Sequence, residues 1–562
     1  MLLLWKKKTI TRDPISHKSM ARKKERHREP PAVPDEEDKL SWRSAGGDVW
    51  ERALDESDIS RDVDPDKSFF DTDDVTRAVD RLTTAMLRAG GVGCVLKGGL
   101  NLFSWLAGMS KTRRRGSMSG KPGPSVRDAL HDTAAFASFL VAFAGTYVSV
   151  DECLALRYGK QRSKQWRAAV AGLVAGPALL LADGPHVKGG GAKRHYGLAT
   201  YLWLRSTVLI ARCGLKRRDS RDTHPLAKAA LAPFAHEHAD VALMMASTWV
   251  ILSCFVLKPD ALQGAYGSFL NKHGGKTKAH YAALRAMSLA STPAQTRDAI
   301  RSAAIALFPH DITAHEALMN VANMDDGSLL AAKPTLWGLV LYPGSDALAH
   351  FFGFYREALG RALPIYVPLY AIPALIVHRH RLLGPRGGVL AMRAAAGAGR
   401  SSAFLAAYCA CAWLAPDALQ RLVFGTLSGW TVSASVPLAG LAVLIEKPSR
   451  RQELGVYCAS RALEAAAVCL VSWGWVPRSL AARTRVDVAL FAVGAAAIMH
   501  CYNTERDVFR SKYLNVLDFV FGNAGHGRQC IRHVGSYYQV AFAGGDTHKN
   551  ESASRQFRDV SS

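Results

Sequence analysis

The sequence predicts an all-α, multi-pass transmembrane protein made of two homologous repeats of about five helices each, with disordered termini. The first observation behind this prediction is internal. Residues 239–275 and 486–522 align without a gap at a constant offset of 247 (487 − 240), which places Cys254 on Cys501 and Tyr266 on Tyr513. A constant offset with matching residue types indicates an internal duplication. The second observation is that uncharged runs rich in Ala, Leu and Val approach the roughly 20 residues that cross a bilayer as a helix.

The third observation is the position of the charge. The chain has 562 residues and a net charge of +24, which is typical either of a nucleic-acid-binding protein or of a membrane protein with basic connections. The positive residues lie between the apolar runs rather than along one polar face. This pattern favours the lipid bilayer as the main partner, and we expect no nucleic-acid partner.

Cysteine spacing gives no sign of a metal site. The ten cysteines are scattered, and none forms a Cys-x-x-Cys pair. We expect buried, reduced thiols that behave as small apolar side chains. No other motif indicates a bound metal or cofactor, so the sequence predicts neither.

The two ends of the chain read as polar tails. Residues 1–78 are basic up to about residue 34 and acidic from there to Asp74, with few apolar residues. Such a composition cannot bury enough apolar surface to fold, so we expect a disordered tail. Residues 526–562 are also polar, and we expect a second tail there.

The first predicted repeat, residues 79–275, holds five apolar segments, at 87–109, 134–156, 168–183, 196–213 and from 239 onward. Lys97 interrupts the first segment and Arg205 the fourth. An intramembrane cation usually faces the protein interior or extends to the membrane surface.

The third apolar segment carries a helix-packing signal. Gly172 and Gly176 form a small-xxx-small pair, which lets two helix backbones approach closely. Pro177 follows at once, so we expect a kink there.

The second predicted repeat, residues 341–525, follows a polar linker at 276–340. Its first apolar segment, 358–378, contains Pro364, Pro368 and Pro373, and three prolines predict a bent or broken helix supported by its neighbours.

Segments 403–414, 422–445 and 454–475 continue the second repeat before the copy at 486. Gly425 and Gly429 provide a second small-xxx-small pair. Arg461 falls on Arg205 at an offset of 256 (461 − 205), the same offset that places Tyr457 on Tyr201. Pairing with a nearby carboxylate such as Glu464 competes with a role for these arginines in a transport pathway.

The orientation of the two repeats stays open at this point. Five crossings per repeat would put the repeats in opposite orientations, as in many transporters. If one segment per repeat only lies at the interface, the repeats are parallel. Nearly every connection in the first half is basic, so the positive-inside rule does not decide.

Several spaced motifs of the second half resemble the transmembrane protein 135 family, also described as a peroxisomal membrane protein. The motifs are Pro364-Ile-Tyr-Val-Pro-Leu-Tyr370, Ser402-Ala-Phe-Leu405, residues 444–451, residues 457–464 and residues 495–502. The first half is similar to the family's other repeat through Phe139-Leu140, the Gly172/Gly176 helix and Tyr201 to Arg205. The family also has a distant similarity to the Tim17/Tim22/Tim23 translocase family. Two departures are the lack of evident cysteine-rich segments and the C-terminal place of the half that resembles the family's N-terminal unit.

The resemblance implies a multi-pass protein of the peroxisomal or mitochondrial membrane, linked to mitochondrial fission and organelle lipid balance. It implies no catalytic residues, so we expect a non-enzymatic protein whose partners are lipids and other membrane proteins of these organelles. The alternative is a carrier or Tim17-like translocase component that moves a lipid, a metabolite or a polypeptide. A membrane-embedded enzyme is a second alternative, but no His–carboxylate set or activated nucleophile stands out.

Overall fold

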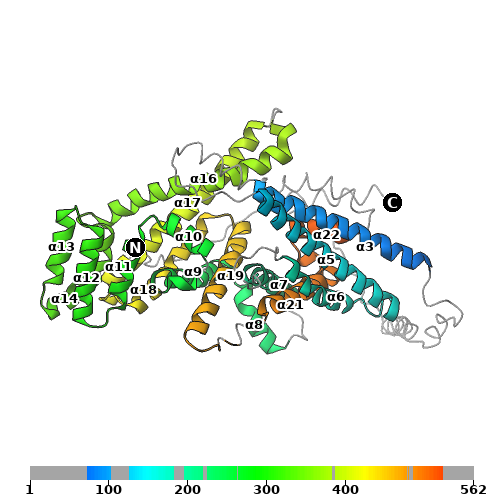
Figure 1. The fold of residues 1–562 in the computed structure, drawn as a ribbon, viewed down its shortest axis with the longest axis horizontal. Helices are drawn as coiled ribbons and strands as arrows, with labels where there is room; N and C mark the ends of the chain where they lie inside the picture. Colours follow the sequence, from blue (N-terminus) through cyan, green and yellow to red (C-terminus); the bar gives the residue numbers. More distant parts are fainter. Residues whose placement is uncertain are drawn as a thin grey trace, which may run out of the picture. The chain divides into compact units, whose positions relative to one another are not determined.

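The computed structural model describes residues 72–102, 126–182, 195–218, 224–262, 264–382, 387–477, 479 and 485–522. Within these ranges every regular element is a helix and no strand occurs, which confirms the all-α prediction (Figure 1). The predicted tails lie almost wholly outside the described residues. The first described helix begins at Thr72, six residues before the predicted end of the first tail at residue 78.

Five of the described helices are long and apolar enough to cross a membrane, judged by length and composition. They cover Val126–Tyr158, Ala239–Leu257, Gly387–Phe424, Pro448–Ser472 and Val486–Thr504. Two shorter apolar helices cover Arg167–Ala182 and Gly429–Ile445. Apolar helices of this length place the chain in a lipid bilayer.

The first half of the described chain forms a series of helices that ends with a short amphipathic one. They are α3 (Thr72–Gly93), π-helix η1 (Cys94–Gly98), α5 (Val126–Tyr158), α6 (Arg167–Ala175), 3₁₀ helix η2 (Gly176–Ala182), α7 (Tyr196–Arg217), α8 (Pro225–Ala235), α9 (Ala239–Leu257), 3₁₀ helix η3 (Pro259–Ala261) and α10 (Gly264–Gly274).

The second half contains a closely similar series. It comprises α16 (Ala347–Leu382), α17 (Gly387–Leu419), π-helix η5 (Gln420–Phe424), α18 (Gly429–Ser435), 3₁₀ helix η6 (Val436–Ile445), α19 (Pro448–Ser472), α21 (Val486–Thr504), 3₁₀ helix η7 (Arg506–Val508) and α22 (Ser511–Phe521).

The ends of the two series agree residue for residue. Helices α9 and α21 each have 19 residues, and each is followed by a three-residue 3₁₀ helix and an 11-residue helix. Both long helices end in the same way: the Lys258 N–H donates to the Cys254 carbonyl at 2.8 Å, and the Glu505 N–H donates to the Cys501 carbonyl at 2.8 Å. The sequence offset of 247 is therefore also an offset between helix boundaries.

Each of these terminal helices packs with the helices of the other half. Helix α21 packs against α6, η2 and α7, and α22 packs against α3 and α5; together they form what we call the N bundle. Helix α9 packs against η6 and α19, and α10 contacts α16; with α17 and α18 they form the C bundle. The two halves thus exchange their terminal helices, and each bundle contains helices from both halves of the described chain.

Contacts along the four central helices fix their directions. The His195 N–H donates to Asp487 at one end of the α7–α21 pair, and the Cys213 and Cys501 sulfurs meet near the other, so these two helices are parallel. Gly455 lies against Asp240 and Cys469 meets Cys254, so α9 and α19 are also parallel.

Helices α7 and α19, in contrast, are antiparallel. Gly197 near the start of α7 lies against Arg461 and Glu464 in the second half of α19. Arg212 near the end of α7 donates to Gln452 near the start of α19 at 2.7 Å.

The predicted polar linker at 276–340 is folded. It forms α11 (Lys278–Leu289), α12 (Pro293–Leu307), α13 (Ile312–Ala322), α14 (Asp326–Ala332), 3₁₀ helix η4 (Lys333–Thr335) and α15 (Leu336–Leu341). Thr292, Asp311 and Asp325 cap three of these helices through side-chain oxygens, which accept from backbone N–H groups. Buried Leu284 and Ile300 join the apolar cluster of the C bundle. The linker is therefore a helical layer built onto that bundle.

Candidate functional site

The small-residue pair, Gly172 on α6 and Gly176 at the start of η2, lies at a close helix approach in the N bundle. A Cβ added at Gly172 would lie 2.9 Å from the Ala495 carbonyl oxygen, and one at Gly176 would clash with Ala492. Both partners are on α21. The small side chains of α6 and α21 thus let the two backbones meet without a gap.

In the C bundle the corresponding approach is made by Gly440 rather than by the predicted pair. A Cβ at Gly440 would lie 2.8 Å from the Cα of Met245 on α9. Gly425 instead ends η5 with φ of 62° and has open space around it, and Gly429 meets only leucine side chains at 3.6 Å or more. The predicted segment 422–445 is split here by a turn that needs a left-handed residue.

The predicted kink residues behave differently in the two halves. Pro177 is the second residue of η2, where the α-helix tightens to 3₁₀ geometry. Pro364, Pro368 and Pro373 all lie inside α16, which runs without a break from Ala347 to Leu382. The structure therefore excludes a broken helix at these prolines.

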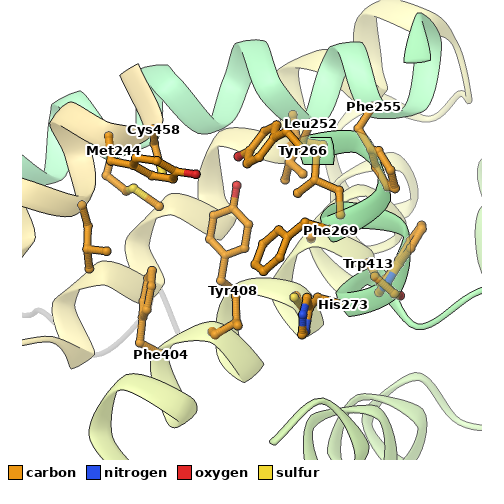
Figure 2. Close-up of a pocket in the computed structure, with 18 of the residues that line it drawn as sticks. Met244, Leu252, Phe255, Tyr266, Phe269, His273, Phe404, Tyr408, Trp413 and Cys458 are labelled. Atoms are coloured by element: carbon orange, nitrogen blue, oxygen red, sulfur yellow. The ribbon is translucent and has the colours of Figure 1, made fainter. Parts of the chain in front are cut away.

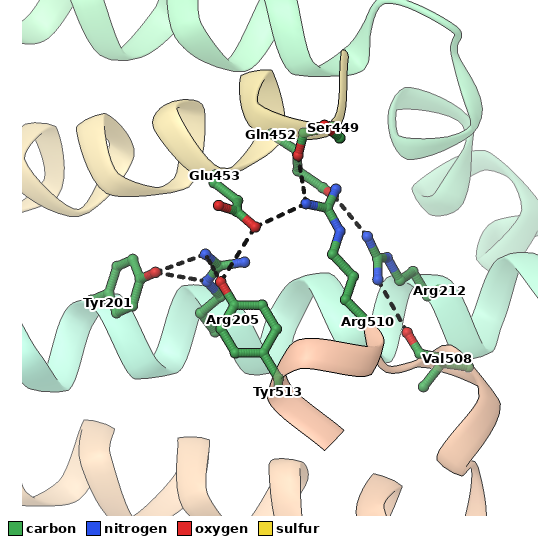
Figure 3. A network of polar contacts seen from close by, with 9 residues as sticks. All are labelled: Tyr201, Arg205, Arg212, Ser449, Gln452, Glu453, Val508, Arg510 and Tyr513. Carbon is green, nitrogen blue, oxygen red and sulfur yellow. Dashed lines mark hydrogen bonds and ion pairs between the residues drawn. The ribbon is translucent and has the colours of Figure 1, made fainter. Parts of the chain in front are cut away.

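Arg205 belongs to a polar network that joins α7, α19 and α22 (Figure 3). Its guanidinium donates to the Tyr201 hydroxyl at 2.7 Å and to the Tyr513 hydroxyl at 2.8 Å, and it lies over both rings. Tyr513 donates in turn to Glu453 at 3.4 Å, and Arg510 pairs with the same carboxylate at 3.1 Å. Aromatic faces and hydroxyls hold this cation without a carboxylate of its own.

The network continues through Arg212 at the end of α7. Arg212 donates to the Val508 carbonyl at 3.1 Å, and Arg212 and Arg510 both donate to the Gln452 side-chain oxygen at 2.7 Å. The network therefore ties helices of the first half to helices of the second.

Arg461, like Arg205, lies over a tyrosine ring, but it also forms a direct ion pair. Its guanidinium lies over the Tyr457 ring and pairs with Glu464 at 3.0 Å. Glu464 was the carboxylate that the sequence offered as a partner. Both predicted arginines are thus engaged in contacts within the protein, and Gly197 on α7 makes room for Arg461. Lys97, on η1, pairs with Asp132 of α5 at 2.9 Å.

The C bundle contains an apolar cavity of about 140 Å³, which is lined by residues of α9, α10, α16, α17, η6 and α19 (Figure 2). Its walls are mainly Leu, Phe and Tyr side chains. Tyrosine hydroxyls, among them those of Tyr266 and Tyr408, and the His273 ring supply its few polar groups. A cavity of about 150 Å³ holds a benzene-sized group, so this one suits a short stretch of hydrocarbon.

A basic cluster lies at the Gly274 end of the cavity. The Arg361 guanidinium lies against Gly275 and over the Phe354 ring, and its Nη1 pairs with Glu357 at 3.3 Å. Its Nε and Nη2 atoms are buried without a hydrogen-bond partner. Burial, with the charges of Lys272 and Arg361, lowers the pKa of His273 to about 4, so this histidine is neutral at pH 7.

Asp151 was not singled out from the sequence. This buried carboxylate accepts from Arg81 at 3.2 Å and from Arg167 at 3.0 Å, which ties α3, α5 and α6 together. The two arginines offset the cost of burying its charge. Among the described residues, no group of three or more His, Cys, Asp or Glu side chains is placed to hold a metal ion.

Residues 345–469 match the family model for the N-terminal cysteine-rich region of transmembrane protein 135. This stretch contains Cys409, Cys411, Cys458 and Cys469, so the expectation that the chain lacks the family's cysteine-rich region was wrong. No curated protein and no solved structure matches the chain.

Proposed function

We propose that the chain, whose residues 345–469 match the model of the transmembrane protein 135 family, is a non-enzymatic membrane protein of that family that acts in peroxisomes or mitochondria, in organelle dynamics or lipid homeostasis. The apolar helices agree with an integral membrane location. The observation that carries the proposal is the apolar cavity inside the C bundle.

The cavity is chemically suited to bind rather than to react. Its lining offers hydrocarbon, tyrosine hydroxyls, the thiols of Cys409 and Cys458, and one histidine that burial keeps neutral. A hydrolytic or acyl-transfer site needs a nucleophile beside a base that a third group orients. The lining residues provide no carboxylate for that third role. The cavity is therefore suited to take up part of a lipid chain without converting it.

We further propose that the chain consists of two homologous repeats in inverted orientation. Three features support this: the matching helix boundaries at the offset of 247, the exchange of α9 and α21, and the antiparallel course of α7 and α19. Helices at matched positions that run in opposite directions are what an inverted repeat requires.

The location and the role of the cavity can be tested together. We expect the tagged full chain to coincide with peroxisomal or mitochondrial markers, and its loss to change organelle shape or lipid content. Ala412 lines the cavity, and Ala412→Phe adds a ring of the size that the cavity holds. This variant should reach the membrane but fail to restore the phenotype.

The matched control is Gly399→Ala on the same helix, where an added Cβ meets nothing within 4 Å. It should restore the phenotype fully. Residence in a membrane of another compartment, or full rescue by Ala412→Phe, would show the proposal to be wrong.

The inverted arrangement also favours a second candidate function, that of a carrier or a Tim17-like translocase component. Inverted repeats commonly place a substrate site between them. Arg205→Gln and Arg461→Gln should abolish flux of a lipid or metabolite in reconstituted vesicles if these residues line a pathway. Arg461 contacts Glu464, and Arg205 contacts tyrosines. Because of these contacts, we expect the two Arg→Gln variants to have unchanged flux and a less stable fold.

A further inference from the structure

Four cysteines form two sulfur–sulfur contacts between the halves of the chain. Cys213 on α7 lies 3.9 Å from Cys501 on α21, and Cys254 on α9 lies 3.7 Å from Cys469 on α19. Each contact joins one helix of the first half to one of the second. Neither pair was visible as a spacing in the sequence, because the partners are more than 200 residues apart.

The two sulfur–sulfur contacts lie at equivalent positions in the alignment of the two halves. Cys254 falls on Cys501 at the offset of 247, and Cys213 falls on Cys469 at 256 (469 − 213), the offset that also relates Arg205 to Arg461. The neighbouring contacts repeat as well: Lys216 pairs with Glu505 beside one thiol pair, and Lys258 donates to Ser472 beside the other. A packing accident would not reproduce itself at both places.

We propose that these pairs are two oxidation sites, Cys213–Cys501 and Cys254–Cys469, which form disulfides that lock the halves together. The oxidant is a hydroperoxide such as hydrogen peroxide. One thiol and H₂O₂ give a sulfenic acid and one water; the partner thiol then displaces the second oxygen as water and forms the S–S bond. Two electrons pass from the two thiols to the peroxide. The two thiol hydrogens end in the two water molecules.

The two sulfurs of each pair are already in contact. The sulfurs must approach by about 1.7 to 1.9 Å to reach the ~2.05 Å bond length of a disulfide. Each pair also lies about one helical turn from a helix end, since Cys254 precedes Leu257 and Cys501 precedes Thr504 by three residues. A small oxidant therefore has a short path to each sulfur.

Exposure predicts which pair reacts first. Cys213 is partly exposed, whereas Cys254, Cys469 and Cys501 are buried. Thiol oxidation follows accessibility, so the Cys213–Cys501 disulfide should form several-fold faster.

The two sites face opposite ends of the central helices. Both pairs lie near the C-terminal ends of their helices, and α7 runs antiparallel to α19. If the helices span a bilayer, as the proposed function holds, one pair faces each compartment. Each disulfide would then report the redox state of a different side of the membrane.

The test uses the full chain with a protease site inserted in the exposed turn at 344–346, which separates Cys213 and Cys254 from Cys469 and Cys501. In a background with the other cysteines replaced by Ala, we keep one pair at a time. After peroxide treatment and cleavage, most of the chain should run as one species on a non-reducing gel and as two after reduction.

The matched control keeps Cys213 with Cys469, two thiols that remain in place but have lost their partners. Since the central helices of 19 residues span about 28 Å, this pair should not link the fragments. Linkage in the control equal to that of the native pairs, or no linkage in either native pair, would overturn the proposal. The experiment on each native pair is repeated with the other cysteines replaced by Ser instead of Ala. The result then does not depend on one set of replacements.

The sidedness is tested in sealed vesicles with a charged, membrane-impermeant reductant added outside, with a permeant reductant as the reference. One pair should open and the other should stay linked. If both open from outside, or if neither opens while the permeant reagent opens both, the assignment to two compartments is wrong. These readouts do not depend on organelle shape or lipid content, so they can succeed where the proposed function fails.

Discussion

The proposed repeat matches the helices of the N bundle with those of the C bundle, but the two interiors differ. In the N bundle, Tyr147 and Phe521 meet edge to face with ring centroids 5.0 Å apart, and both are buried. In the C bundle the matched positions hold Ala412 and Gly274, and both line the cavity. The matching uses the offsets 265 (412 − 147), which also aligns Phe139 with Phe404, and 247 (521 − 274).

The difference shows that the cavity does not follow from the arrangement of helices. At these positions the N bundle has two buried aromatic side chains, whereas in the C bundle the two smallest residues line the cavity. An empty cavity lowers the stability of a fold, so selection for stability alone would favour larger side chains that fill it. A cavity that is kept is therefore a candidate binding site.

The largest effect is expected from Tyr147→Ala in the N bundle. Tyr147 is 1 % exposed, and truncation of a buried aromatic side chain typically costs about 3–5 kcal/mol. We expect this loss in the free energy of unfolding, measured by denaturant or heat in detergent, together with a new cavity that binds a small apolar probe. The counterpart is Ala412→Phe in the C bundle, which should remove probe binding there at a much smaller cost. Equal effects of the two changes would contradict the comparison.

A second effect is expected at the glycines of the close approaches. Gly176→Val should destabilise the chain by about 1–3 kcal/mol or more, because its Cβ would clash with Ala492 on α21. Gly440→Val should have an effect of the same size if the bundles are equivalent, since its Cβ would press on the Met245 backbone.

Gly425 and Gly399 serve as controls for these glycine variants. Gly399→Ala should be neutral, because nothing lies within 4 Å of the added atom. Gly425→Val should destabilise through its positive φ and not through helix contact. A neutral Gly440→Val would show that the two approaches are not equivalent.

The sequence predicted the helices of the two bundles better than it predicted how these helices pack. The offset of 247 relates the bounds of α9 to those of α21, and the pair Gly172/Gly176 lies at a helix contact, because both signals are local in the chain. The exchange of α9 and α21 was not predictable, since it depends on which of several similar apolar faces meet. The cavity depends on side-chain volume at Ala412 and Gly274, which no pattern of hydrophobicity records.

A third test compares the two matched arginines. Arg461 has the carboxylate of Glu464, whereas Arg205 is held by Tyr201 and Tyr513. A double-mutant cycle with Arg461→Gln and Glu464→Gln should give a coupling energy of about 0.5–3 kcal/mol, as contacting residues in one network do. The same cycle with Arg205→Gln and Glu464→Gln should give a value near zero. Similar coupling in both cycles would show that the arginines share one network.

The smallest effect concerns acid, and it again separates the bundles. His273 in α10 falls on Val520 in α22 at the offset of 247, so the C bundle has a titratable group where the N bundle has none. Burial lowers the pKa of His273 in the folded chain to about 4, and burial lowers that of His280 in α11 to about 4. In the unfolded chain both pKa values lie near 6.5.

Between pH 6.5 and 4 the unfolded state therefore binds more protons than the folded state, so the stability that depends on these neutral histidines falls as the pH decreases through this window. Hydrogen exchange, corrected for the intrinsic rate, should show α10 and α11 opening more often at pH 5 than at pH 7, while α22 changes little. His273→Gln removes the titrating group and should reduce the response of α10. If α10 and α22 respond alike, the acid sensitivity does not come from His273, and the two bundles do not differ in this respect.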